Sequence, residues 1–244
     1  MNRSLALPRK HLVTTVGLFL LAVLVALGAW GLPRLSADAA SQAQDLQVSA
    51  HGHGHGHGHA TVPRTASQVA FHDQMRKLWE DHVTWTRLAI VTFADGSPAF
   101  PATAERLLQN QADIGDAIKP YYGTEAGDQL TALLHDHITI AVEILQAAKA
   151  GDTAGLADAR ARWSANGDEI GNFLGTANPR YWPAADMRAS MATHLEQTFA
   201  EAADELAGNY PASVTDYEAA HLHMLDMADT LSSGIIAQFP KQFR

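Results

Sequence analysis

From Ser67 to the C-terminus, apolar residues recur at every third or fourth position. The first such stripe contains Phe71, Met75, Leu78 and Trp85, and this spacing is typical of one face of an α-helix. Proline and glycine divide the pattern into six predicted helices, which cover residues 67–93, 101–119, 125–149, 153–174, 184–207 and 213–239. Strand patterns are absent, so the sequence predicts an all-α domain over residues 67–244.

One pattern of polar and apolar residues occurs twice, about 55 residues apart. The segment from Leu78 to Thr84 corresponds to the one from Leu133 to Thr139, and both contain Asp-His, a β-branched residue and threonine. Downstream, Asn110 to Asp116 corresponds to Asn166 to Asn172. A fainter third copy follows in the C-terminal part of the chain. A fixed period of this length indicates repeated supersecondary units, so we expect a six-helix bundle built from three repeated αα-hairpins.

The N-terminus carries a second kind of hydrophobic pattern. Residues 12–32 are almost continuously apolar, with Arg9 and Lys10 before them and Pro33 after them. The run matches the roughly 20 residues that cross a bilayer, although residues 37–39 form a small-x-small site that suits a signal peptidase. Residues 1–35 are therefore predicted to be a transmembrane anchor or a cleaved signal peptide. Either segment would place the rest of the chain outside the cytoplasm.

Residues 36–66 lack an apolar period and are predicted to be a flexible linker. Within this linker, five histidines alternate with glycine: His51, His53, His55, His57 and His59. Imidazole is a good ligand for Zn, Cu, Ni and Fe, and glycine leaves the backbone free to wrap around an ion. The segment is predicted to bind metal; the alternatives are repeat slippage in a disordered tail, or a purification tag.

Composition narrows the classes of function. The chain has 26 acidic and 17 basic residues, a net charge of −9 and no cysteine. Affinity for nucleic acid requires clustered lysine and arginine, so an acidic body of this kind is not expected to bind it. The absence of cysteine excludes disulfides, thiolate metal sites and thiol catalysis.

The repeated histidines and polar residues are predicted to meet at one level of the bundle. His82 and Asp113 lie at similar numbers of residues from the loop that joins their helices, and His137 and Asn166 do so in the next pair. With a rise of about 1.5 Å per residue, each pair then shares a level in an antiparallel hairpin. The candidate core ligands are His82, Asn110, Asp113, His137, Asn166, Glu169, His194 and His221.

Two interpretations of this polar layer are open. If the carboxylates of Asp113 and Glu169 point inward with the histidines, the layer could hold one Zn, Mn, Fe, Ni or Cu ion. The pattern of ferritin-like di-iron proteins needs four glutamates and two histidines with Glu-x-x-His, whereas this layer offers Asn-x-x-Asp/Glu and only two carboxylates, which argues against a di-iron oxidase. The alternative is a hydrogen-bonded network, because a buried histidine needs a partner and an amide across the hairpin supplies one. An acid–base enzyme is a weaker third hypothesis.

Several motifs resemble those of a family of bacterial exported or membrane-anchored helical-bundle proteins. The resemblance covers about residues 70–244, and its motifs are residues 81–87, 110–115, 119–123 and 227–232. It implies a helical fold and an exported location, and it implies no activity. Some members carry a glycosyltransferase label, but a nucleotide-sugar fold needs strands and glycine-rich turns, which this sequence lacks.

Together these patterns favour the extracytoplasmic binding of divalent transition-metal ions by the histidine–glycine segment, with a possible second site in the bundle core. The rival hypothesis is a non-catalytic structural or sensing bundle whose polar layer only sets the register of the helices.

Overall fold

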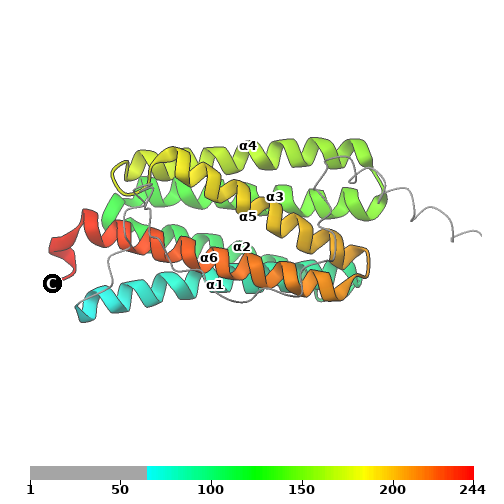
Figure 1. Ribbon diagram of the computed structural model, residues 1–244, viewed down its shortest axis with the longest axis horizontal. Coiled ribbons are helices and arrows are strands. Elements are labelled where there is room, and N and C mark those ends of the chain that lie inside the picture. Colours follow the sequence, from blue (N-terminus) through cyan, green and yellow to red (C-terminus); the bar gives the residue numbers. More distant parts are fainter. Residues whose placement is uncertain (1–64) are drawn as a thin grey trace, which may run out of the picture. The chain divides into compact units, whose positions relative to one another are not determined.

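The computed structural model describes residues 65–244, which form a bundle of six α-helices (Figure 1). The helices are α1 (Ala66–Ala94), α2 (Phe100–Tyr122), α3 (Thr124–Ala150), α4 (Thr153–Ala177), α5 (Ala184–Leu206) and α6 (Tyr210–Gln238), followed by the 3-10 turn η1 (Pro240–Gln242). These residues contain no strand. The prediction of an all-α, six-helix bundle is confirmed, and the helix boundaries lie within a few residues of the predicted ones.

The predicted N-terminal anchor or signal peptide and the histidine–glycine segment lie outside the described residues. Between residues 65 and 244, no helix has the length and hydropathy required to cross a membrane.

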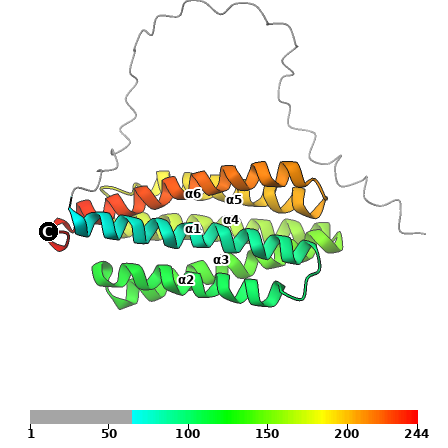
Figure 2. The ribbon, with the colours of Figure 1, turned by 90° about the horizontal axis from the view of Figure 1, so that it is seen from below.

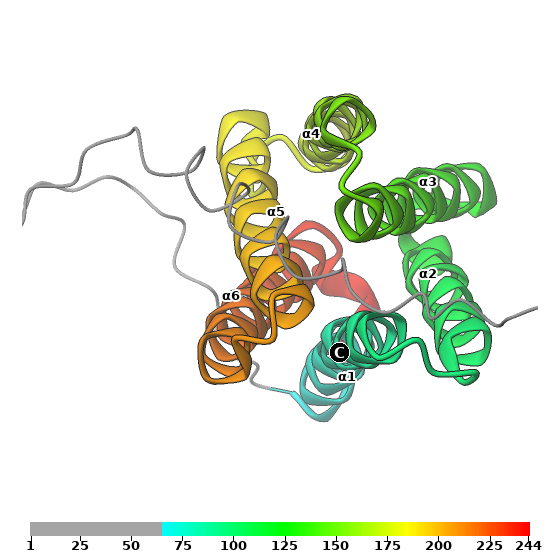
Figure 3. The same ribbon diagram turned by 90° about the vertical axis from the view of Figure 1, so that its right-hand side faces the viewer.

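The six helices are arranged in a ring. Each helix packs against the next one in the chain, and α6 returns to pack against α1. Figure 3 shows this ring end-on, and in Figure 2 α1 lies between α2 and α6. Each inward face therefore meets the common axis of the bundle, where the buried side chains gather.

Local sequence signals define the ends of the helices. Thr65 and Gln68 form a capping box at the start of α1, which satisfies two of the backbone N–H groups that a helix leaves unpaired. Gly151 ends α3 in the left-handed conformation, with φ of 69°, which glycine adopts at no steric cost. Asp152 then caps α4 by accepting a hydrogen bond from the Gly155 amide at 2.9 Å.

Two glycines allow α2 and α3 to approach closely. A Cβ atom added to Gly115 would lie 2.6 Å from the carbonyl oxygen of Gly127, and one added to Gly127 would lie 2.7 Å from that of Gly115. Any larger residue at either position would force the two helices apart. Beside this contact Ile114, which is 1 % exposed, points into the core.

Aromatic residues close one end of the bundle. The rings of Tyr121 and Phe243 stack with their centroids 5.3 Å apart, and Phe71 meets both of them at 5.0 and 5.2 Å. Trp182, which is 2 % exposed, donates its indole N–H to the carbonyl oxygen of Thr230 at 3.2 Å. These contacts join the end of α2 to α1 and the C-terminus, and the loop after α4 to α6.

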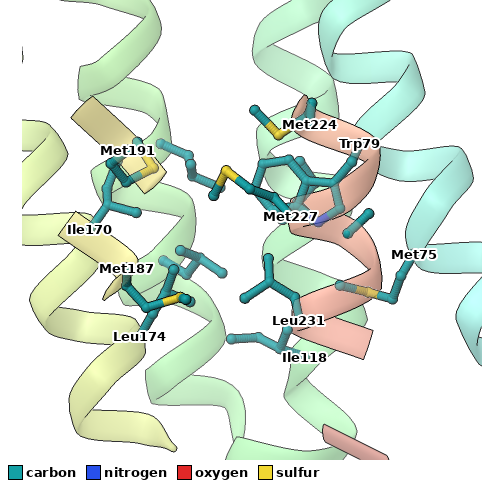
Figure 4. Close-up of a cluster of buried hydrophobic side chains, with 14 of the residues drawn as sticks. Met75, Trp79, Ile118, Ile170, Leu174, Met187, Met191, Met224, Met227 and Leu231 are labelled. Carbon is teal, nitrogen blue, oxygen red and sulfur yellow. The ribbon is translucent and has the colours of Figure 1, made fainter. Parts of the chain in front are cut away.

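The main hydrophobic core fills the axis on the side of the bundle nearest this aromatic end. Figure 4 shows part of it, with side chains from all around the ring converging on one another. Five methionines belong to this core: Met75, Met187, Met191, Met224 and Met227. Because methionine is unbranched and flexible, it fills the irregular space at the centre of a ring of helices.

Candidate functional site: a buried histidine layer

Three histidines from alternate helices meet near the middle of the bundle. His82 lies on α1, His137 on α3 and His194 on α5, and each is at most 3 % exposed. The ring of His194 lies between the other two, with its centroid 5.7 Å from that of His82 and 5.8 Å from that of His137. We call these three residues the histidine layer. The sequence predicted all three as members of one polar level.

In the pair formed by α3 and α4, a single amide, that of Asn166, forms the hydrogen bond that the buried His137 requires. The Nδ1–H of His137 donates to Oδ1 of Asn166 at 2.9 Å, and Nδ2 of Asn166 donates to the carbonyl oxygen of Leu133 at 3.0 Å. Trp163 stacks on the imidazole with centroids 5.1 Å apart, and its indole N–H donates to the carbonyl oxygen of His137 at 3.1 Å. The neutral ring therefore carries its proton on Nδ1.

In the pair formed by α1 and α2, two neighbouring amides, those of Asn110 and Gln111, lie beside the buried His82. Asn110 donates from Nδ2 to the carbonyl oxygen of Leu78 at 3.0 Å. Gln111 donates from Nε2 to the carbonyl oxygen of Leu107 at 2.7 Å and faces Nδ1 of His82 at 3.3 Å. Because that nitrogen is a donor, Nδ1 of His82 accepts, and the neutral ring carries its proton on Nε2. The sequence analysis missed Gln111.

A signal for Gln111 was nevertheless present in the sequence. Gln111 follows His82 by 29 residues, and Asn166 follows His137 by the same 29. Aligning Asn110 with Asn166 obscured this spacing, because the identical residue types lie one position out of register.

His194 has no amide partner from the next helix. Its Nδ1 lies 3.4 Å from the hydroxyl of Thr198, one turn further along α5. The residue that follows His194 by the same 29 residues is His223 on α6. Its Nε2 lies 3.0 Å from the carbonyl oxygen of Ser190, much as Asn166 contacts that of Leu133. The third histidine is thus held by its own helix and by the two imidazoles on either side.

Burial keeps the histidine layer uncharged. Desolvation, followed by the nearby His137, lowers the pKa of His82 to about 3. Desolvation also lowers the pKa of His137 to about 4. The pKa of His194 falls well below its usual value, first through desolvation and then through the neighbouring histidines. All three imidazoles are therefore neutral near pH 7, and a proton added to one of them would repel a second.

The prediction that Asp113 and Glu169 point inward with the histidines is wrong. The carboxylate of Asp113 lies 3.4 Å from the guanidinium of Arg106 at the edge of the bundle, and Glu169 is exposed. Burying a carboxylate without a cation is costly, and at the edge of the bundle Asp113 gains Arg106 as a partner. The interior of the layer therefore contains the amides of Asn110, Gln111 and Asn166 and neither of these carboxylates.

His221 lies apart from the histidine layer. Its side chain is 22 % exposed and stacks on Tyr217, and its Nε2 lies 3.6 Å from a carboxylate oxygen of Glu80. Over residues 65–244, no group of three or more histidine, aspartate and glutamate side chains is arranged to hold a metal ion. The chemistry of the histidine layer is that of paired hydrogen bonds between neutral groups.

A second polar cluster lies in the half of the bundle nearest the α1–α2 loop, and the sequence analysis missed it. Arg87 on α1 donates to Glu205 at 2.9 Å, to Glu201 at 3.3 Å and to the hydroxyl of Ser213 at 2.5 Å. Ser213 in turn donates to Glu205 at 2.6 Å. We call these four residues the arginine cluster. Glu201 and Glu205 are 2 % and 5 % exposed, so two buried carboxylates share one cation.

This sharing changes the titration of one carboxylate. Desolvation raises the pKa of Glu201 to about 7, although the adjacent Arg87 opposes the shift. Spacing along α5 could have revealed the cluster, because His194, Thr198, Glu201 and Glu205 follow one another at intervals of three or four residues. Such a spacing places all four side chains on one face of the helix.

Comparison with protein-family models, with curated proteins and with solved structures finds no match for this chain.

Proposed function

We propose that this protein binds divalent transition-metal ions outside the cytoplasm through its histidine–glycine segment, residues 51–59. In this proposal the helical bundle is a non-catalytic body that carries the segment, and the N-terminal apolar run anchors the chain or directs its export. The observation that carries the proposal is the alternation of five histidines with glycine. Neutral imidazoles are good ligands for Zn, Cu and Ni.

The geometry of the bundle supports placing the metal on the segment and not in the core. Nδ1 of His137 already donates a hydrogen bond to Asn166, and Nδ1 of His82 already accepts one from Gln111. The rings of His137 and His194 are stacked, with an interplanar angle of 26°, whereas three ligands of one ion must direct nitrogen atoms to a common point about 2 Å from each. We infer that the histidine layer sets the register of the helices.

We further infer that the bundle consists of three copies of one αα-hairpin. This supports the register role, because duplication of a hairpin copies a histidine–amide pair without any need for a ligand. The equal spacing of His82 to Gln111 and of His137 to Asn166 agrees with such a duplication.

The test compares metal binding by the full chain and by two variants. In the first variant, His51, His53, His55, His57 and His59 are replaced by serine. In the second, matched in chemistry but placed in the core, His137 is replaced by glutamine. Isothermal titration with Zn(II), Ni(II) and Cu(II) at pH 7.5 should show binding by the parent and by His137→Gln and a large loss in the five-serine variant. At pH 5 the parent should release the metal, because unperturbed imidazole has a pKa of about 6.5.

Two outcomes contradict the proposal. Absence of binding by the parent would reject metal binding altogether. Equal binding by the five-serine variant, with loss in His137→Gln, would move the site to the histidine layer and leave the segment without a role.

A further inference from the structure

The half of the bundle that contains the arginine cluster also contains a cavity of about 50 Å³, beside the histidine layer. Its walls come from α1 to α5, and three of the lining residues are alanines, Ala89, Ala141 and Ala202. On the other side of the layer methionine and tryptophan fill the axis, and the remaining space there is about 20 Å³. The cavity therefore arises where small side chains face the axis.

The cavity separates two small hydrophobic clusters. One cluster contains Ala89, Leu107 and Ile138, the other contains Ile90, Leu145 and Ala202, and both are distinct from the main core. All six residues line the cavity. A molecule in this space would join the two clusters and gain apolar contacts with both.

The polar atoms of the wall define the chemistry of that molecule. The lining residues with polar side-chain atoms are His137, His194, Thr198, Thr86 and Trp163, and the wall contains no acidic or basic residue besides the two histidines. Thr86 and Trp163 already donate to the carbonyl oxygens of His82 and His137. Because Nδ1–H of His137 donates to Asn166, the remaining ring nitrogen, Nε2, is a hydrogen-bond acceptor. Burial keeps both imidazoles neutral, as their lowered pKa values show. A pocket with mainly apolar walls and a few polar groups is the usual form of a small-molecule site.

We propose that this cavity is a binding site for a small neutral molecule that has an apolar body and one hydroxyl or N–H donor, which His137 accepts. The volume sets the size of the molecule. An apolar cavity of about 150 Å³ holds benzene, so about 50 Å³ corresponds to two or three non-hydrogen atoms. An ion is excluded by the absence of a countercharge in the wall. This site is independent of metal binding by residues 51–59.

Ethanol and acetonitrile are suitable probes, because both have three non-hydrogen atoms and only ethanol has a donor. In the full chain, ethanol should give saturable NMR shifts of the Leu107, Ile138, Ile90 and Leu145 methyl groups and of Nε2 of His137. The dissociation constant should be on the order of millimolar or weaker, as the size of the ligand requires. Acetonitrile should bind about 2- to 10-fold more weakly, the range for one hydrogen bond, without the Nε2 shift.

A variant that fills the space provides the control. Ala202→Val adds two methyl groups to the wall and should abolish the ethanol shifts, whereas Ala219→Val, an exposed position on α6, should leave them unchanged. Equal binding by Ala202→Val, or equal binding of both probes with the same Nε2 shift, would overturn the proposal. If Ala202→Val does not fold, titration of the parent chain with xenon tests the site instead. Absence of saturable NMR shifts of the cavity methyl groups on addition of xenon would overturn the proposal.

Discussion

The two halves of the bundle, on either side of the histidine layer, are built in different ways. Toward the aromatic end, the axis is filled by large flexible and aromatic side chains such as Met75, Trp79, Met191 and Met227 (Figure 4). Toward the α1–α2 loop, alanines line a cavity and two carboxylates are buried with one arginine. One half of the bundle is thus densely filled with apolar side chains, whereas the other half contains a cavity and buried charged groups.

This difference indicates which half provides most of the stability. Dense apolar packing stabilises a fold without specifying a ligand, whereas a cavity and a buried ion pair are weak or neutral contributions to stability. We infer that the filled half maintains the bundle and that the other half contains the groups able to bind a ligand or to change protonation, namely the cavity and the arginine cluster. The histidine layer separates them and has properties of both, because it is buried and uncharged but polar.

Acid should give the largest effect, because it acts on both polar clusters with opposite signs. His82, His137 and His194 have lowered pKa values in the folded state, so their stabilisation is present above pH 6.5 and is lost as the pH falls below it. Glu201 has a raised pKa of about 7, so its protonated form adds stability as the pH falls from 7 to about 4.5. Between pH 6.5 and 4.5, the unfolded state binds about two more protons at these four groups than the folded state does. The free energy of unfolding should therefore decrease by on the order of 2–3 kcal/mol for each pH unit of acidification.

Urea unfolding at pH 6.5 and 4.5 measures this loss, and Glu201→Gln separates the two clusters. Without the opposing carboxylate, the free energy of unfolding of the variant should decrease more steeply with acid than that of the parent. The extra slope should correspond to about one further proton bound by the unfolded state. A parent whose stability is unchanged or increased at pH 4.5 would contradict the account of the histidine layer.

Breaking the arginine cluster should give the next largest effect. Arg87→Met leaves Glu201 and Glu205 buried without their cation and should lower the free energy of unfolding at pH 7.5 by about 3–5 kcal/mol. The triple variant that also carries Glu201→Gln and Glu205→Gln should recover much of this loss. Arg162→Met removes a half-exposed arginine that pairs with Glu143 and Asp158, and should cost less than about 1 kcal/mol.

A single hydrogen-bond partner in the histidine layer should matter less. Asn166→Leu removes the acceptor for His137 and the donor to Leu133, which should cost about 1–3 kcal/mol through the unpaired buried groups. Chemical denaturation with and without Zn(II) tests the role of the layer at the same time. A cost that depends on Zn(II) would contradict a purely hydrogen-bonded layer.

Filling the cavity should give the smallest effect, and it should stabilise the protein. At about 24 cal/mol per Å³, a void of about 50 Å³ corresponds to roughly 1 kcal/mol, so Ala202→Val should raise the melting temperature by a few degrees. Met227→Ala, in the filled half, should lower stability by about 2–5 kcal/mol. A destabilising Ala202→Val would show that the two halves are equally well packed.

The periodic pattern of the sequence determined where the helices lie. Apolar residues at every third or fourth position can be buried only on one face of a helix, and proline and glycine mark the ends, so six helices with nearly correct boundaries followed from local rules. The repeated Asp-His motifs predicted one level of buried histidines, because equal distances from a loop place residues side by side in an antiparallel pair.

Only the tertiary structure decided which polar side chains accompany those histidines. Asp113 and Glu169 share the sequence pattern of the amides, yet they lie at the edge or the surface, while Gln111 is completely buried. A rotation of one helix by a fraction of a turn decides between these outcomes, and the packing of neighbouring helices, such as the close approach of Gly115 to Gly127, sets that rotation. The arginine cluster joins α1, α5 and α6 across more than one hundred residues of sequence. Local periodicity places Glu201 and Glu205 on one face of α5, but it does not identify Arg87 and Ser213 as their partners, because those contacts depend on how the ring of helices closes.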